Sequence, residues 1–436
     1  MAKKAFNTLS TATLGIGTMV GVGIFIVIGL AGSIAGNLVW ISFVIGGIIA
    51  LLSGYSLAKL AIRFPSRGGI IEYLVQEFGE NPFSGSLSVM FYFAQLVTLA
   101  AVAKSFGEYG ARLFGYHSTF MIDAFAVGII LFFTFINLLG ATLVAKSENI
   151  IVAIKLIALT IFTIAALMTI KPQYLSMKDA PPIINAVFAI GLTFFAYQGY
   201  SVITNAIEDM ENPSKTVLKA MFIAIGVVTI LYVSVSIAVL GNLPLSEVIK
   251  AKDYALAEAA KPVFGELGFK IMSVVALISA TSAINATIYA ATEISYTLAK
   301  KGELPKIYEY NVFHSYEGLL ISTALIIPMV LFFNLSEITT VAALSVLIIQ
   351  ALVHFGHIKL TPKTGANKGV IIFAFLLMTF VVLATLYYNA KQDIKIIYYL
   401  IGGFVIAYII EIILRKLFNR TVKKQIKGLT GELFQH

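Results

Sequence analysis

The chain has 436 residues, of which 59% are hydrophobic and only 12% are charged, and its formal net charge is +9. Soluble proteins carry about 25% charged residues, so this composition excludes an ordinary soluble domain and indicates a chain that crosses a membrane repeatedly. The basic residues are spread between apolar runs, which argues against a nucleic-acid partner. The absence of cysteine excludes disulfides and thiolate metal sites, and the five histidines show no metal-ligand spacing, so we expect no cofactor.

Apolar runs of about 20 residues predict an all-α membrane protein with twelve transmembrane helices. The expected spans are residues 8–35, 38–62, 84–111, 120–141, 145–169, 185–207, 217–240, 270–299, 318–334, 337–356, 368–389 and 396–417. No cleavage site follows the first apolar run, so we interpret it as a retained span and not as a signal peptide. Most loop lysines and arginines fall on the side of the two chain ends, which predicts a plasma-membrane protein with both termini in the cytoplasm.

The first expected span contains four glycines in a short stretch, at Gly15, Gly17, Gly21 and Gly23. Each glycine costs about 1 kcal/mol relative to alanine inside a helix. A helix that breaks within a membrane exposes backbone N–H and C=O groups, which is tolerated only where they lie inside protein or line a cavity. The stretch therefore predicts a broken helix at mid-membrane, of the kind that forms the binding site in many secondary transporters.

The sixth expected span contains a second candidate break at residues 194–201, where aromatic and polar residues surround Gly199. Taken alone, this glycine could equally serve helix packing. Two interrupted spans at corresponding positions, five spans apart, favour inverted repeats with a binding site between them. We therefore expect one transport domain over residues 1–436, divided into a first repeat at 8–170, a second repeat at 183–356, two additional helices at 368–417 and a basic cytoplasmic tail at 418–436.

Several motifs resemble those of the amino acid–polyamine–organocation (APC) superfamily of transporters. The glycine pattern of the first span is similar to the first-helix signature of that superfamily. Further similar stretches occur in order along the chain, namely Arg63-Phe64-Pro65-Ser66-Arg67-Gly68-Gly69, Asn137-Leu138-Leu139-Gly140 with Glu148-Asn149 and Lys155, Glu208-Asp209-Met210-Glu211-Asn212-Pro213 with Thr216, and Lys301-Gly302-Glu303-Leu304-Pro305. The resemblance covers nearly the whole chain and is strongest to archaeal proton-coupled amino acid transporters. It implies a LeuT-like 5+5 inverted-repeat fold with broken helices 1 and 6.

Broken helices suit a free amino acid, which carries a carboxylate and an ammonium group. The half-helix that begins near Val20 would direct N–H groups and its positive dipole end at the carboxylate. Carbonyls freed by the two breaks would accept hydrogen bonds from the ammonium group. We expect the substrate to contact Met19, Val20, Gly21, Val22, Gly23, Phe194, Phe195, Ala196 and Tyr197. The resemblance implies that Phe195 is a gate on the outer side.

The lining expected at the two breaks is mostly apolar, and neither break contains an acidic side chain that could pair with a basic substrate. An apolar pocket with a few polar groups selects ligands of matching character. The sequence therefore predicts symport of neutral, mainly apolar L-amino acids over a broad range. The expected partners are the amino acid, protons and the lipid bilayer, and we expect the protein to function as a monomer.

Lys155 lies about ten residues into the fifth expected span, which places its amine near the middle of the bilayer. A charge there costs at least about 2.5–3.5 kcal/mol, so such residues are functional by default. Removal from water favours the neutral amine, which makes Lys155 a candidate proton carrier. As an ammonium ion it would bond to carbonyls near Gly15 and Gly17 and to the hydroxyls of Ser279 and Ser282. The alternative interpretation is a permanently protonated structural cation.

Two other charged residues, Lys104 and Glu108, lie four positions apart in the third span and are expected to pair with each other. The alternative function within transport is an obligate exchanger of amino acids or amines, in which Lys155 is only structural. A membrane-embedded sensor or channel is a second class, although no polar stripe runs along several helices. An intramembrane Ser–Lys hydrolase using Ser279, Ser282 and Lys155 is the third. We expect a transporter and not an enzyme.

Overall fold

The computed structural model describes residues 7–21, 23–66, 68–139, 143–176, 178, 180–301, 304, 306–312 and 315–418. Helices and 3-10 turns make up most of the first half, as α1 (Thr8–Met19), α2 (Gly23–Ala35), η1 (Gly36–Leu38), α3 (Val39–Arg63), α4 (Ile70–Phe78), α5 (Pro82–Leu113), α6 (Thr119–Leu138), α7 (Leu143–Met168) and η2 (Pro172–Leu175).

The second half continues in the same way after a loop. Its elements are α8 (Ile183–Ala196), η4 (Gln198–Ser201), α9 (Val202–Asn205), η5 (Ile207–Asp209), α10 (Pro213–Asn242), α11 (Leu245–Lys250), α12 (Ala255–Glu258), α13 (Lys261–Lys301), η6 (Lys306–Glu309), β1 (Asn311–Val312), β2 (Ser315–Tyr316), α14 (Glu317–Phe332), α15 (Leu335–Thr364), α16 (Lys368–Gln392) and α17 (Lys395–Phe418). The two short strands pair antiparallel, Asn311 with Tyr316 and Val312 with Ser315. They are a small departure from the expected all-α fold.

The described residues include nine helices that are long and apolar enough to cross a membrane, or ten if the bent pair α8 and η4–α9 counts as one span. The prediction of a helical multi-pass membrane protein is therefore confirmed. Every stretch expected as a span holds a helix. The helix α14 has only 16 residues, because Phe333 and Asn334 separate it from α15.

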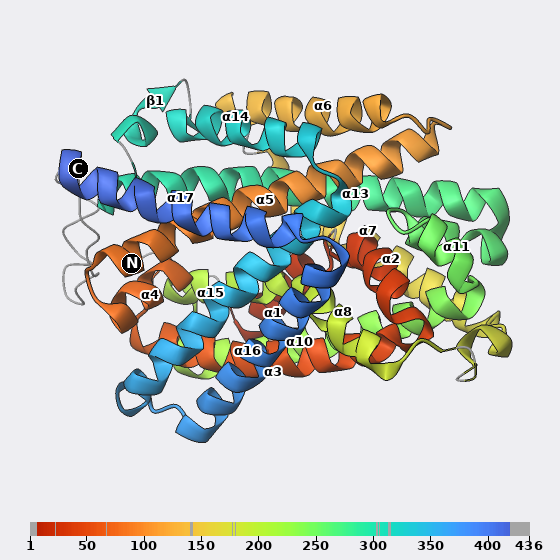
Figure 1. Ribbon diagram of the computed structural model, residues 1–436, viewed down its shortest axis with the longest axis horizontal. Helices are drawn as coiled ribbons and strands as arrows, with labels where there is room; N and C mark the ends of the chain where they lie inside the picture. The colour runs from red at the N-terminus through yellow and green to blue at the C-terminus, as the bar shows by residue number, and fades with distance from the viewer. Residues whose placement is uncertain are drawn as a thin grey trace.

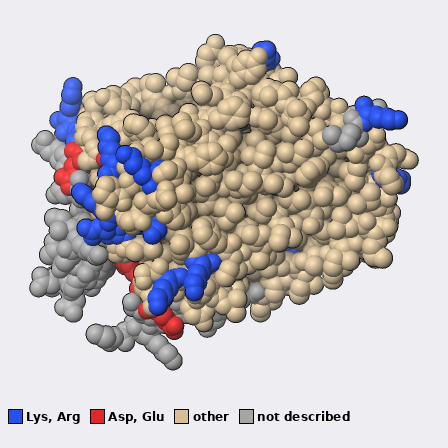
Figure 2. Space-filling view, turned by 90° about the horizontal axis from the view of Figure 1, so that it is seen from below, with Lys and Arg blue, Asp and Glu red and all other residues tan. Residues whose placement is uncertain are grey.

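The long helices lie mostly along the longest axis of the molecule, and the two ends of that axis differ (Figure 1). The helix α4, the strand β1 and the end of α17 lie at the end where the chain termini are marked, whereas α11 lies at the opposite end. On the face seen in Figure 2, most charged side chains gather at these two ends, and the broad band between them carries few. Such a band is what a bilayer core requires of the surface that it contacts.

The helices α1, α2 and α8 form the centre of the molecule, where they contact α3 and α10. The run from Phe25 to Ile28 is fully buried there. The outer helices instead expose large apolar side chains, such as Phe132 on α6, Ile161 on α7 and Phe380 on α16. Apolar side chains on the outside and a buried helical centre indicate lipid around the molecule and a functional site within it.

Candidate substrate and coupling site

The first helix break is present where the glycines predict it. The helix α1 ends at Met19, and α2 begins at Gly23. Val20 closes α1 with non-helical angles (φ −77°, ψ 53°), and its N–H donates to the carbonyl of Ile16 at 2.8 Å. Val22, one of the expected substrate contacts, lies outside the described residues. The break leaves the first N–H groups of α2 without helical partners, in a buried place.

The second break is also present at its predicted position. The helix α8 ends at Ala196, and the chain continues through η4 into the single turn of α9 with a bend of 43°. Tyr197 forms the junction between the two segments. The 3-10 turn of η4 offers the shorter-range bonding that often replaces an α-helical ladder at such a junction.

The two breaks touch each other through glycines. A methyl group added to Gly199 would lie 2.4 Å from the backbone nitrogen of Met19, and one added to Gly23 would lie 3.0 Å from the Cα of Ala196. The hydroxyl of Thr18 donates to the carbonyl of Gly199 at 2.9 Å. Because only glycine allows backbone to approach backbone so closely, these residues are required by the contact between the breaks.

A tyrosine on α10 connects both breaks, and our sequence analysis did not identify it. The Tyr232 hydroxyl lies 2.6 Å from the carbonyl oxygen of Met19 and 3.3 Å from that of Ala196. Both are carbonyls that the interrupted helices leave without a regular partner. Tyr232 is fully buried, so its hydroxyl donates a hydrogen bond at a place that bulk water does not reach.

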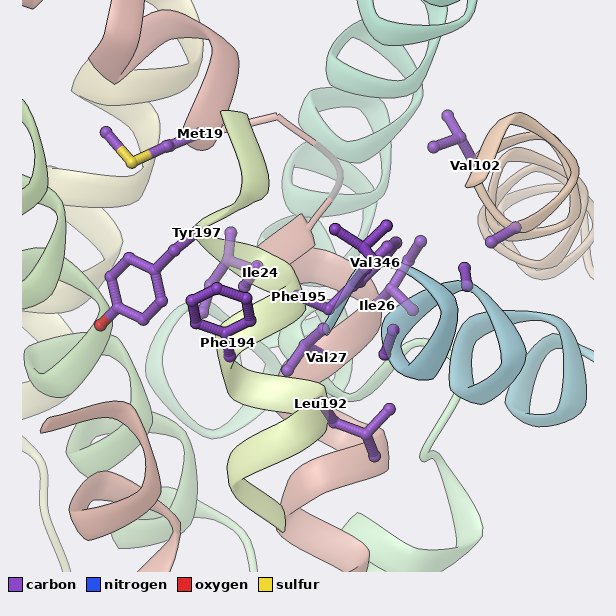
Figure 3. Packing of buried hydrophobic residues seen from close by; sticks show 14 of the residues in the cluster. Met19, Ile24, Ile26, Val27, Val102, Leu192, Phe194, Phe195, Tyr197 and Val346 are labelled. Carbon is purple, nitrogen blue, oxygen red and sulfur yellow. The ribbon is translucent and has the colours of Figure 1, made fainter. Parts of the chain in front are cut away.

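The side chains expected to line the substrate site diverge from the second break. Figure 3 shows Phe194 and Tyr197 on one side and Phe195 on the other. The ring of Phe194 lies edge-on to Tyr200, with centroids 6.4 Å apart, and the Tyr197 hydroxyl donates to the carbonyl of Phe43 at 2.9 Å. Phe194 therefore packs against η4, Tyr197 packs against α3 and α10, and Phe195 is 6% exposed.

The remaining expected substrate contacts lie close around the first break. Met19, Val20, Gly21 and Ala196 are buried, and Gly23 is partly buried. A methyl group at Gly21 would meet only the carbonyl oxygen of Thr18, at 3.4 Å, and the Cβ of Ala283 on α13, at 4.0 Å. The backbone of the two breaks thus meets at Gly23 and Ala196, with Gly21 facing α13, whereas the side chains of Phe194, Phe195 and Tyr197 diverge.

Lys155 occupies the position expected for a coupling residue. Its side chain on α7 is only 2% exposed, and its Nζ donates to the carbonyl oxygen of Gly17 at 2.8 Å. A methyl group at Gly17 would lie 2.8 Å from Val152, one turn earlier on α7, so glycine lets α7 approach α1 closely. A buried amine that bonds to a broken helix is placed to influence the state of that helix.

The other residues expected around Lys155 are also buried. Gly15 packs against Ile203 and Ala224, and its carbonyl oxygen lies 3.0 Å from the Thr18 hydroxyl oxygen. Ser279 and Ser282 on α13 are buried, and the hydroxyl of Ser279 has no hydrogen-bond partner in the described part of the chain. A buried hydroxyl without a partner is costly, so it marks a place where a ligand, a water molecule or a second conformation could supply one.

The predicted ion pair between Lys104 and Glu108 is wrong, because each residue has another partner. The Lys104 Nζ lies 2.5 Å from the carboxylate of Asp123 on α6 and donates to the carbonyl oxygen of Val330 on α14 at 2.8 Å. Glu108 instead lies 3.6 Å from Arg112. Spacing along one helix predicted a local pair, but two neighbouring helices provide a carboxylate and a carbonyl for Lys104.

A cavity of about 400 Å³ lies away from the breaks, between α5, α14, α15 and α17. Its lining is apolar and includes Phe93, Met329 and Tyr399, but none of the residues expected to contact substrate. Its one charged lining residue is Glu337, whose carboxylate accepts from the backbone N–H of Asn334 at the start of α15. We therefore place the candidate site at the breaks, where backbone groups are available, and not in this cavity.

A multi-pass helical protein with two touching helix breaks and a buried lysine beside one of them has the form of a secondary transporter. A model of the amino acid permease family matches residues 6–406, and the chain belongs to that family. It is 38% identical to an uncharacterized protein of Methanocaldococcus jannaschii over 97% of this chain and 98% of the relative. It is 33% identical to the inner membrane transport protein YbaT of Escherichia coli, over 96% of this chain and 98% of the relative.

A more distant relative is the serine/threonine exchanger SteT of Bacillus subtilis, which is 25% identical over 84% of this chain and 85% of its own length. The family and its named relatives are transporters and not enzymes. This protein is therefore an amino acid transporter of the membrane, and the hydrolase alternative is set aside.

Proposed function

We propose that this protein carries neutral, mainly apolar L-amino acids across the plasma membrane together with protons, by alternating access and as a monomer. The observation that carries the proposal is the bond from the buried amine of Lys155 to the carbonyl of Gly17 in the broken first helix. A titratable group in contact with the element that forms the substrate site can couple protonation to substrate binding.

The proposed architecture has twelve spans in two inverted repeats of five, followed by two helices, with both termini in the cytoplasm. The two breaks, in α1–α2 and α8–α9, support it because they lie at corresponding places of the two halves. The shared position of α4, β1 and the end of α17 at one end of the molecule agrees with the predicted arrangement of loops (Figure 1).

The substrate carboxylate is proposed to bind at the N-terminus of α2, near Gly21 and Gly23, where N–H groups and the positive end of the helix dipole are available. Its ammonium group would bond to carbonyls of the breaks. Tyr232 already bonds to Met19 and Ala196, so substrate binding either shares these acceptors or displaces the hydroxyl. Phe195, on the other side of α8 from Phe194, is the proposed gate.

In the proposed cycle, protonated Lys155 ties α7 to α1 and stabilises the outward-open state that binds substrate. After the inward rocking motion, water reaches the amine and the proton leaves. The neutral amine bonds more weakly to the carbonyl of Gly17, because a charged donor makes the stronger hydrogen bond. The half-helix α1 then loosens and the substrate departs.

Obligate exchange is the second candidate function, and the serine/threonine exchanger among the relatives favours it. In that case Lys155 remains protonated and only holds α1 in place. Both candidates agree on an amino acid substrate, and they differ in whether a proton gradient drives accumulation.

Purified protein in liposomes separates these candidates through uptake of radiolabelled L-alanine. We expect an inward proton gradient to drive accumulation into empty vesicles. If the gradient has no effect and uptake requires amino acid inside the vesicle, the protein is an exchanger and proton symport is rejected.

A further inference from the structure

Two histidines absent from the coupling scheme lie in a buried polar stripe between α3 and α15. On α15, Gln350, His354 and His357 are spaced at positions i, i+4 and i+7, which places them on one helix face. On α3, Ser53 and Ser56 are spaced i and i+3 and face them. All five residues are completely buried. Buried polar side chains of this number require mutual hydrogen bonds, and the structure provides them.

The hydrogen bonds join these residues into one continuous chain. The Tyr200 hydroxyl donates to Ser53 Oγ at 2.7 Å, and Ser53 Oγ lies 2.9 Å from His354 Nε2. Ser56 Oγ lies between the two rings, 3.0 Å from His354 Nδ1 and 2.8 Å from His357 Nδ1. His357 Nε2 is 2.9 Å from the hydroxyl of Thr364.

The two ends of this hydrogen-bonded chain, Tyr200 and Thr364, lie in different parts of the molecule. Tyr200 belongs to η4 and directly follows Gly199, which touches the end of α1. Thr364 is the last residue of α15, is only partly buried, and has the exposed Lys363 and Gly365 beside it. The chain therefore runs from the second helix break to the surface at the end of α15.

Each member of this chain can both give and receive a proton. A hydroxyl donates one hydrogen bond and accepts others, and a neutral imidazole donates from one nitrogen and accepts at the other. Gln350 lies beside the path, with its Oε1 2.6 Å from the Tyr200 oxygen and its Nε2 donating to Gln198 at 3.0 Å. Tyr200 has a single hydroxyl proton, which it donates either to Gln350 or to Ser53, and the relay uses the second orientation. Gln350 holds the Tyr200 hydroxyl in position but is not needed as a link.

Other ionisable groups around α15 do not bond to the two histidines of the hydrogen-bonded chain. Glu77 on α4 lies against Gly356, and Tyr55 on α3 accepts from the backbone N–H of Asn367, with Lys59 above its ring. No ionisable residue occurs on α8. On α5, Tyr92 forms a hydrogen bond with Ser322. Lys368 lies at the start of α16, and Glu411 on α17 pairs with Arg415. In the described part of the chain, neither ring forms an ion pair or a hydrogen bond with any of them.

We propose that Tyr200, Ser53, His354, Ser56, His357 and Thr364 form a proton relay between the second helix break and the surface at the end of α15. The inference rests on the proposed proton coupling: the water that takes the proton from Lys155 is its donor to Tyr200, and the relay adds the route from the second break to the surface. Its starting arrangement has hydroxyl donors at Tyr200, Ser53 and Ser56, with N–H groups at His354 Nδ1 and His357 Nε2.

Transfer along the relay balances at every step. A proton arriving at the Tyr200 oxygen releases the original hydroxyl proton to Ser53, and Ser53 gives its own to His354 Nε2. His354 Nδ1 then gives its proton to Ser56, which protonates His357 Nδ1. His357 Nε2 gives its proton to Thr364, whose hydroxyl proton passes to water. Each O–H or N–H bond that breaks is matched by one that forms, and both rings finish in the opposite tautomer.

The test compares proton movement with substrate exchange in the same liposomes. A pH-sensitive dye trapped inside reports protons that accompany L-alanine, and counterflow of radiolabelled L-alanine reports exchange. Ser56→Ala removes the link between the two rings, and Thr364→Val removes the partly exposed end without changing its shape. Ser42→Ala is the matched control, because Ser42 is an equally buried serine of α3 that donates only to the carbonyl of Ala186.

We expect both relay variants to slow alanine-dependent proton movement by about a hundredfold or more, the lower end of what a positioned proton donor or acceptor typically contributes. Counterflow should stay within about twofold of wild type, as should both readouts for Ser42→Ala. Wild-type proton movement in both relay variants overturns the relay while the proposed symport stands. An equal loss of both readouts also overturns it, since that is a structural defect. Counterflow without proton movement in the wild-type protein rejects the symport itself.

Discussion

One hydroxyl group holds the two helix breaks together at the centre of this transporter. Tyr232 bonds to carbonyl oxygens on both sides of the contact, at Met19 and Ala196, and is completely buried. Its single proton goes mainly to the nearer oxygen, that of Met19, so removing the hydroxyl leaves this buried acceptor without its donor, which costs more than an ordinary hydrogen bond contributes. The residue therefore links the stability of the fold to the geometry of the substrate site.

We predict that Tyr232→Phe lowers the free energy of unfolding by about 1–3 kcal/mol, the cost of unsatisfied buried groups. Thermal unfolding in detergent measures this change, and the apparent affinity for alanine should weaken in parallel. The matched control is Tyr387→Phe, since Tyr387 is 54% exposed on α16. Equal thermal midpoints for Tyr232→Phe and wild type would show that the hydroxyl does not support the breaks.

Single residues could be predicted from the sequence where their role depends on a local pattern. The depth of Lys155 in its span predicted a buried amine near Gly17, and the structure places it there. Tyr232 and the pair His354 and His357 were not identified, because key partners are remote in sequence: Met19 is 213 residues from Tyr232, and Ser56 is 298 residues from His354. A tyrosine in an apolar helix looks like ordinary packing until the carbonyl that it meets is known.

Among the elements, the contact between α1 and η4 depends on the absence of a side chain at Gly199. A methyl group there would lie 2.4 Å from backbone atoms of Thr18 and Met19, and backbone cannot move aside as a flexible side chain can. We predict that Gly199→Ala costs about 1–3 kcal/mol through overpacking and abolishes alanine uptake. The control Gly226→Ala, on α10, has nothing within 4 Å of the added methyl group. Wild-type uptake by Gly199→Ala would contradict the proposed contact.

The short helix α4 lies against α15 through a buried acid. Both carboxylate oxygens of Glu77 are buried without a hydrogen-bond partner in the described part of the chain, and burial raises the pKa of this group well above its ordinary value of 4.5. The folded state thus favours the neutral acid. Because the folded protein binds this proton more tightly than the unfolded chain, the contribution of Glu77 to stability is largest below pH 4.5 and is lost as the pH rises through the raised pKa.

We therefore predict that the thermal midpoint of the wild-type protein decreases as the pH rises above 4.5, and that Glu77→Gln removes part of this decrease. The two proteins should unfold at nearly the same temperature in acid, where the wild-type carboxyl group is neutral. The exposed residue Glu80, in the loop after α4, offers the control Glu80→Gln. Parallel pH profiles for Glu77→Gln and wild type would contradict this account.

Helix breaks were predicted well where glycines cause them, and helices were predicted well where long apolar runs form them. Both breaks lie where Gly15 to Gly23 and residues 194–201 indicated, and each expected span holds a helix. The pairing of Lys104 with Glu108 was wrong, because spacing within one helix carries no information about Asp123 on the next helix. Contacts between helices follow from packing of the whole chain, which no single segment determines.

For the whole molecule, the absence of cysteine makes the proposed topology directly testable. Lys363, at the end of α15, and Tyr116, between α5 and α6, are both exposed and lie on opposite sides in the proposed topology. We predict that a membrane-impermeant maleimide added to intact cells labels Tyr116→Cys but labels Lys363→Cys only after the cells are opened. Labelling of both variants from outside, or the reverse pattern, would contradict the orientation derived from loop charge.

The central claim is that Lys155 carries the coupled proton, and the measurement that tests it most directly compares two modes of transport in Lys155→Ala. Accumulation of radiolabelled L-alanine driven by an inward proton gradient should be lost, while counterflow without a gradient continues at a measurable rate. The control Lys391→Ala, an exposed lysine at the end of α16, should behave as wild type in both modes. Accumulation by Lys155→Ala that still follows the proton gradient would show that another group carries the proton.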